Sequence, residues 1–200
     1  LTHSRFFGTV SNVFKSLVRS TDFLIESFPP EYMERIGFGY EAVSAINPSI
    51  VFTSVTPFGQ SGPYKDYEVS DMVLWAMGGV MATCGDKDRS PVRCSVPQAY
   101  YFAGLQAATG SMVAHYHRQL SGEGQYVDVS IQESVLLNVP NSVMSWDTFQ
   151  RNTMRSEGMR VRMLYPCKDG RVVCSIGGAG VGWTQSTIAL TNWMAEEGMA

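Results

Sequence analysis

Histidine and cysteine residues are the first candidates for chemistry in this 200-residue sequence. His115 and His117 stand two positions apart in an expected helix, so their side chains diverge by about 200° around it, whereas a zinc-binding helix uses a spacing of four. The sequence has four cysteines, which are Cys84, Cys94, Cys167 and Cys174. No two of them form a C-x-x-C pair. We therefore expect no metal site, and we expect the cysteines to be reduced and buried.

The glycine-rich segment GGAGVG, residues 177–182, lies between an expected strand and an expected helix. This is the context of a dinucleotide-binding loop, but its glycines do not follow the G-x-G-x-x-G spacing. We favour a tight loop that closes a second domain, and a mobile active-site lid is the functional alternative. The sequence also has no G-x-S-x-G segment, which argues against a serine hydrolase.

Charge and hydropathy exclude several other classes of partner. The net charge is -3, the pI is near 5.6 and no run of Lys or Arg occurs, which argues against nucleic acid or an anionic membrane surface. No apolar stretch approaches the roughly 20 residues that cross a bilayer, and the start lacks the features of a signal peptide. We expect a cytoplasmic protein whose apolar content, 44% of the residues, buries a core.

The elements that position these residues alternate between strands and helices. Runs rich in β-branched residues predict buried strands at 21–27, 49–56 and 125–131. Helical spacing of apolar residues predicts helices at 31–45, 70–83, 98–119 and 132–150, the first of them divided by Gly37 and Gly39. This order predicts an α/β fold with an open, largely parallel sheet covered by crossover helices.

A second, smaller domain is expected towards the end of the sequence. After an Arg-rich stretch, the segment LYPCKDGRVVCSI places Asp169 and Gly170 between two short β-rich runs, which predicts a hairpin. We divide the sequence into an α/β domain at 1–150 and a linker with the start of the small domain at 151–200. Because it begins in mid-pattern and stops directly after a helical run, we expect a fragment of a longer protein.

Five segments between positions 26 and 134 occur in an order that composition and periodicity do not explain. They are ESFPPEYMERIGFG, INPSIVFTSVTPFGQSGPY, DMVLWAMGGVM, PVRCSVPQAYYFAG and GEGQYVDVSIQES. Together they resemble the family III CoA-transferases of the CaiB/BaiF type, which include formyl-CoA transferase, carnitine CoA-transferase and α-methylacyl-CoA racemase.

The resemblance implies a large CoA-binding α/β domain, linked to a small domain, in an interlocked dimer. The partner would be a second copy or a homologue of the same family. An acyl-CoA and a carboxylic acid would be substrates, and no cofactor would be bound permanently. The implied CoA-binding residues are Ser27, Phe28, Arg35 and Ile36. Phe28 offers a face for adenine and Arg35 a cation for phosphate; alternatively, Phe28 belongs to the core and Arg35 is a solvated charge.

The catalytic aspartate of this family is expected four positions before the glycine that matches Gly104, where this sequence has Tyr100. No Asp or Glu occurs between Asp88 and Glu123, so a small alignment shift does not restore it. A phenol with a pKa of about 10 is a poor nucleophile at neutral pH. We favour a space-filling role for Tyr100 in the acyl pocket, and donation of a hydrogen bond to the thioester oxygen is the alternative.

Asp71 matches a second acidic position of the family, near the CoA thioester. Ser70, before it, stands where transferases carry Tyr and racemases carry His. Asp71 is therefore a candidate general base, with a helix-capping or structural carboxylate as the equal alternative. Three activities stay open: a CoA-transferase with a rearranged site, a non-catalytic subunit whose homologue supplies the Asp, and an acyl-CoA lyase, hydratase or epimerase.

Overall fold

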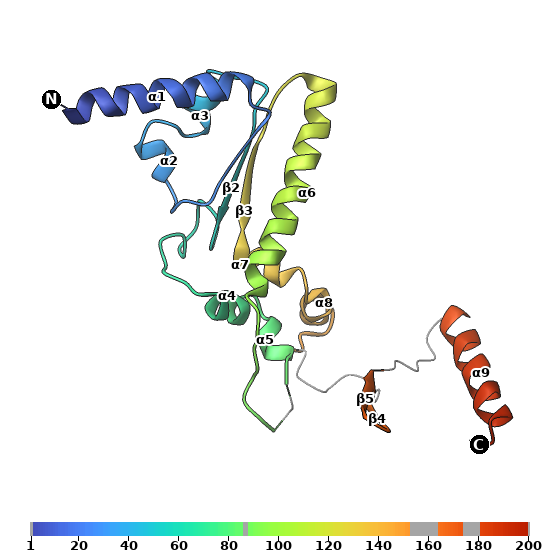
Figure 1. The fold of residues 1–200 in the computed structure, drawn as a ribbon. Helices are drawn as coiled ribbons and strands as arrows, with labels where there is room; N and C mark the ends of the chain where they lie inside the picture. The colour runs from blue at the N-terminus through green and yellow to red at the C-terminus, as the bar shows by residue number, and fades with distance from the viewer. Residues whose placement is uncertain (1, 86–87, 153–163, 174–180, 200) are drawn as a thin grey trace. The chain divides into compact units, whose positions relative to one another are not determined.

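The computed structural model describes residues 2–85, 88–152, 164–173 and 181–199 (Figure 1). The chain separates into two compact units, Leu1–Arg155 and Ser156–Ala200. Within the described ranges, no helix combines the length and apolarity needed to cross a bilayer.

The first unit is built on a parallel sheet of three strands in the order β1 (Phe23–Glu26), β2 (Val51–Thr56) and β3 (Tyr126–Ser130). The predicted α/β class and all three predicted strands are confirmed. β2 is buried, as expected for a central strand. The prediction that β1 is buried is wrong, because β1 has one neighbour among the described strands and leaves Ile25 63% exposed.

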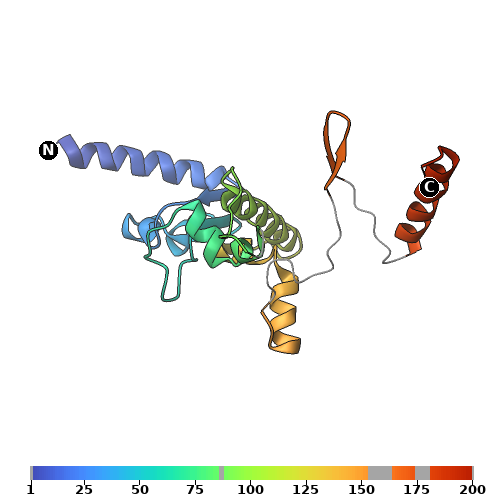
Figure 2. The same ribbon diagram turned by 90° about the horizontal axis from the view of Figure 1, so that it is seen from below.

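One face of the sheet is covered by the long helix α6 (Gln98–Ser121), which contacts β2 and β3 and runs beside them in Figure 1; Figure 2 shows the same helix from below. Its buried positions are small residues about one turn apart, which allow close approach to the sheet: Ala99, Ala103, Ala107, Ser111 and Ala114. The Ser111 hydroxyl shares a buried hydrogen bond of 2.7 Å with the Thr53 hydroxyl of β2.

Three short helices pack around the first turns of α6, beyond the carboxyl ends of the strands in Figure 1: α4 (Asp71–Met77), α5 (Val80–Thr83) and α7 (Ile131–Leu136). They enclose a cluster around Leu74, Trp75 and Val135. The predicted helix at 70–83 is divided because Gly79 adopts a positive φ of 83°. The predicted helix at 132–150 is also divided, since Pro140 begins α8 (Pro140–Phe149) and interrupts the preceding backbone ladder.

On the other face, α1 (Thr2–Ser20) packs with α2 (Tyr32–Arg35) and α3 (Tyr40–Ser44) over a cluster that contains Val18, Met33 and Phe52. The predicted division of 31–45 is confirmed, with Gly37 at a positive φ of 81°. α1 was not predicted.

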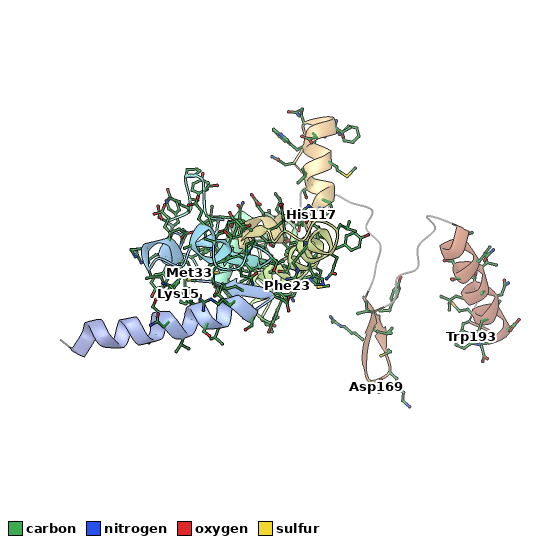
Figure 3. The ribbon with its side chains drawn as sticks, turned by 90° about the horizontal axis from the view of Figure 1, so that it is seen from above. Lys15, Phe23, Met33, His117, Asp169 and Trp193 are labelled. Carbon is green, nitrogen blue, oxygen red and sulfur yellow. The ribbon has the colours of Figure 1, made fainter. Side chains whose placement is uncertain are left out.

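The second unit contains β4 (Leu164–Cys167), β5 (Gly170–Val173) and α9 (Val181–Glu196). The two strands pair in antiparallel fashion, so the predicted hairpin is confirmed, with Asp169 in its turn (Figure 3). The glycine-rich segment lies largely outside the described residues, as does Cys174. Cys167 is exposed and Cys84 and Cys94 are only partly buried, so the prediction of buried cysteines is wrong for these three.

Candidate functional site

The three parallel strands end at one edge of the sheet, where the chain turns into Ser27 after β1, Pro57 after β2 and Ile131 after β3. Two pockets open at this edge. They share Ser27, Pro57 and Val69 in their walls, so they are neighbouring parts of one crevice. Ligands of open α/β sheets bind in this position, outside the carboxyl ends of the strands.

The larger pocket has a volume of about 580 Å³, and we call it the proline pocket. Its lining is Ser27, Phe28, Pro29, Pro30, Arg35, Pro57, Lys65, Asp66, Tyr67, Glu68 and Val69. Three of the four residues predicted to bind CoA therefore lie together. The fourth, Ile36, follows the end of α2, is 46% exposed and does not line the pocket.

Phe28 and Arg35 meet around one aromatic ring. Phe28 stacks on Tyr32 with a centroid separation of 4.8 Å, and the Arg35 guanidinium lies 5.3 Å from the centroid of the same ring. The Phe28 amide donates a 2.7 Å hydrogen bond to the Glu26 carboxylate, which fixes the turn after β1. Because Phe28 stays 48% exposed, its ring has a free surface, and the alternative that it is a core residue does not hold.

Lys65 is a second cation of the proline pocket, and the sequence analysis did not identify it. Its ammonium pairs with Glu31 and, at 3.9 Å, with Asp66. The hydrogen bond between Lys65 and Glu31 raises the pKa of the Lys65 ammonium and lowers the pKa of the Glu31 carboxyl. Glu31 is largely exposed and Lys65 keeps 27% of its side-chain surface exposed, so solvent screens the pair and it contributes little to stability. The sequence signal that could have identified Lys65 is its position directly after the GPY segment at residues 62–64.

The smaller pocket, about 410 Å³, is the tyrosine pocket. Its lining is Ser27, Val55, Pro57, Val69, Tyr100, Ala103, Gly104 and Ile131. Tyr100 is 47% exposed, and Ala103 and Gly104 follow it one helical turn later on the same side of α6. A Cβ added to Gly104 would meet no atom within 4 Å, so the space beside the ring is open. Among the described residues that line this pocket, none carries a carboxylate.

Asp71 lines neither pocket, and its side chain is engaged elsewhere. It is buried at 9% exposure, and its Oδ1 accepts a 3.0 Å hydrogen bond from the Ala99 amide in the first turn of α6. The residue before α6, Pro97, provides no side-chain cap, so Asp71 caps α6 from a neighbouring helix. Its Oδ2 lies 3.9 Å from a guanidinium nitrogen of Arg93. Ser70 caps α4 itself by accepting a hydrogen bond from the Val73 amide.

The two histidines of α6 contact neighbours on their own helix. His115 lies 2.7 Å from the Arg118 guanidinium, and His117 lies 3.2 Å from the Ser121 hydroxyl. In the part of the chain that the structure describes, no three His, Cys, Asp or Glu side chains gather closely enough to hold a metal ion.

A parallel α/β sheet with a divided crevice at its strand ends defines the class of open α/β folds, which hold their ligands at that position. The chain is a member of CoA-transferase family III, whose sequence signature matches residues 10–192.

Similarity to characterised proteins agrees with this membership. The chain is 36% identical over 192 residues to the BbsE subunit of succinyl-CoA:(R)-benzylsuccinate CoA-transferase from Thauera aromatica, covering 94% of this chain and 45% of that protein. It is 37% identical over 126 residues, 62% of this chain and 31% of the relative, to the beta subunit of succinyl-CoA–L-malate CoA-transferase from Chloroflexus aurantiacus.

Among solved structures, a CaiB/BaiF family protein from Brucella suis superposes with a TM-score of 0.75 at 26% identity. The superposition covers 92% of this chain and 50% of that protein. The chain therefore spans about half the length of the relatives it matches.

Proposed function

We propose that the full-length protein transfers CoA between carboxylic acids and that this chain holds the CoA thioester. The observation that carries the proposal is the divided crevice. Its proline pocket has an exposed aromatic ring and two cations, and its tyrosine pocket contains Tyr100, which the sequence resemblance aligns with the catalytic aspartate of the family. Relatives named as CoA-transferases support the same reaction.

In this arrangement the nucleotide end of CoA lies in the proline pocket. The free face of Phe28 offers a stacking surface for adenine, and Arg35 provides a planar cation for phosphate oxygens. Lys65 exchanges Glu31 for a phosphate when CoA enters. The shared wall at Ser27, Pro57 and Val69 then leads the thioester towards Tyr100.

The reaction needs a carboxylate. Its oxygen attacks the carbonyl carbon of the thioester, the C–S bond breaks, and CoA leaves as a thiolate while a mixed anhydride forms. The acceptor acid then opens that anhydride to release the first acid, and the thiolate attacks the new anhydride to give the new acyl-CoA. Tyr100 does not supply this nucleophile, because attack by a phenol would give an aryl ester, which is not exchanged as a mixed anhydride is.

A second candidate function is that of a non-catalytic subunit. The tyrosine pocket has no carboxylate among its described lining residues, so a family homologue would supply the aspartate. Two relatives named as subunits support this version. In the first candidate function the protein is active without a homologue, and the nucleophilic carboxylate then comes from another part of the full-length protein.

Hydroxylamine trapping tests both versions. The full-length protein, alone and with a family homologue that has the aspartate, is incubated with acyl-CoAs and hydroxylamine, and its peptides are mapped by mass spectrometry. A hydroxamate on a carboxylate of this chain supports the active version, and a hydroxamate on the homologue alone supports the subunit version. If no hydroxamate forms in any mixture, the CoA-transferase proposal is wrong.

The variant Tyr100→Asp is the positive control for the trapping chemistry. It places a carboxylate where the tyrosine pocket receives the thioester. We expect a hydroxamate at position 100 in this variant, and Tyr100→Asn is the matched control that cannot form one.

A further inference from the structure

The acyl side of the crevice has a composition that selects a class of substrate. We propose that the tyrosine pocket receives an uncharged hydrocarbon acyl group, alkyl or aryl, rather than an acyl group with a second carboxylate. This inference rests on the proposed binding of a CoA thioester in the crevice. It concerns which thioester the chain prefers, whatever reaction follows.

The first argument is charge. The described lining of the tyrosine pocket contains no Lys, Arg or His, and its polar side-chain atoms are the hydroxyls of Ser27 and Tyr100. Two hydroxyls are enough to donate to a thioester carbonyl oxygen. They do not neutralise a carboxylate, and a carboxylate desolvated against Val55, Val69 and Ile131 is costly when it has no cationic partner.

The two cations of the crevice line the proline pocket instead. Arg35 and Lys65 are both absent from the lining of the tyrosine pocket. CoA itself carries phosphates, and these compete for the same cations. The crevice thus separates a charged half, suited to the nucleotide, from an apolar half, suited to hydrocarbon.

The second argument is shape. Tyr100 and Gly104 stand four positions apart on α6, so they share one face of the helix. The missing side chain at Gly104 leaves open space beside a half-exposed phenol ring. A flat ring or an alkyl chain can lie against that phenol in offset contact, which is the geometry that aromatic side chains favour.

Binding measurements on the full-length protein test the inference without requiring turnover. Dissociation constants of CoA, succinyl-CoA, hexanoyl-CoA and phenylacetyl-CoA are compared by isothermal titration calorimetry. We expect hexanoyl-CoA and phenylacetyl-CoA to bind at least about tenfold more tightly than succinyl-CoA, which is the discrimination that a buried apolar contact provides.

A pair of variants locates the acyl group. Gly104→Leu fills the open space beside Tyr100, and we expect it to weaken hexanoyl-CoA binding at least about tenfold relative to the unacylated CoA. Ala108→Leu is the matched control, since it adds bulk to an exposed position one turn further along α6, outside the tyrosine pocket. Circular dichroism spectra establish that both variants are folded.

The outcomes separate this inference from the proposed function. If succinyl-CoA binds as tightly as the hydrocarbon thioesters, or if Gly104→Leu behaves like Ala108→Leu, the assignment of the tyrosine pocket is overturned and CoA transfer stands. If CoA and its thioesters all fail to bind, the proposed function is overturned and the inference falls with it.

Discussion

Replacing Asp71 with alanine should destabilise the protein through α6. The substitution removes the acceptor of the Ala99 amide hydrogen bond, and Pro97 offers no replacement cap. Loss of an N-cap costs about 0.5–2 kcal/mol, and a charged, buried acceptor places this case near the upper end. We expect the free energy of unfolding to fall by about 2 kcal/mol.

The variant Asp71→Asn separates capping from acid–base chemistry. An amide oxygen still accepts from the Ala99 amide, so the loss is that of the negative charge, which favours the start of α6 and pairs with Arg93 at 3.9 Å; we expect it to cost about 0.5–1 kcal/mol. Urea denaturation of the full-length protein gives the free energy of unfolding of both variants. The matched control is Asp147→Ala, which removes the carboxylate of an exposed helical residue. If Asp71→Ala is as stable as Asp147→Ala, the capping role is refuted. If Asp71→Asn keeps its stability but loses turnover, Asp71 is a general base instead.

Two further predictions concern packing and pH. Urea denaturation should show that the variant Gly104→Ala is more stable than the variant Gly110→Ala by about 1–3 kcal/mol. Both substitutions gain helix propensity, but a Cβ at position 110 would lie 2.8 Å from Val127. Equal denaturation midpoints of the two variants would contradict this packing. Burial raises the pKa of Tyr126, so its neutral form stabilises the folded state below pH of about 10, and this stability is lost as the pH rises through the raised pKa. Tyr126→Phe should therefore show a shallower loss of stability between pH 9 and pH 12 than the unmodified protein; superimposable profiles would refute the effect.

The strands were predictable because burial leaves a mark on their composition. β2 consists of apolar and β-branched residues with small hydroxyls, as expected for a strand covered on both sides. α1 carried a clear helical signal that the sequence analysis did not use. Its apolar residues recur at the spacing of an amphipathic helix, at Val10, Val13, Phe14, Leu17 and Val18.

Part of the site was predictable from two sources: the resemblance, which named both Ser27 and Tyr100 of the tyrosine pocket, and the local sequence around α2. Phe28 and Arg35 lie within a few residues of each other around α2, so their proximity follows from the sequence. Lys65 reaches the same pocket from a loop 30 positions further along the chain. Asp71 bonds to Ala99, 28 positions away, and no periodic pattern encodes that contact. Tertiary packing determines both the position of Lys65 in the pocket and the hydrogen bond of Asp71.

The small side chains of α6 pack against the sheet, whereas another side of the same helix faces the crevice. Ala99, Ala103 and Ala107 set the distance between the helix and the sheet, while Tyr100 faces the crevice and is half exposed. A change at position 100 therefore leaves the core packing intact. Under the proposed function, such a chain would lose its nucleophile, or regain it, by a single substitution with little effect on folding, so that a catalytic subunit and a supporting subunit would differ by one mutation.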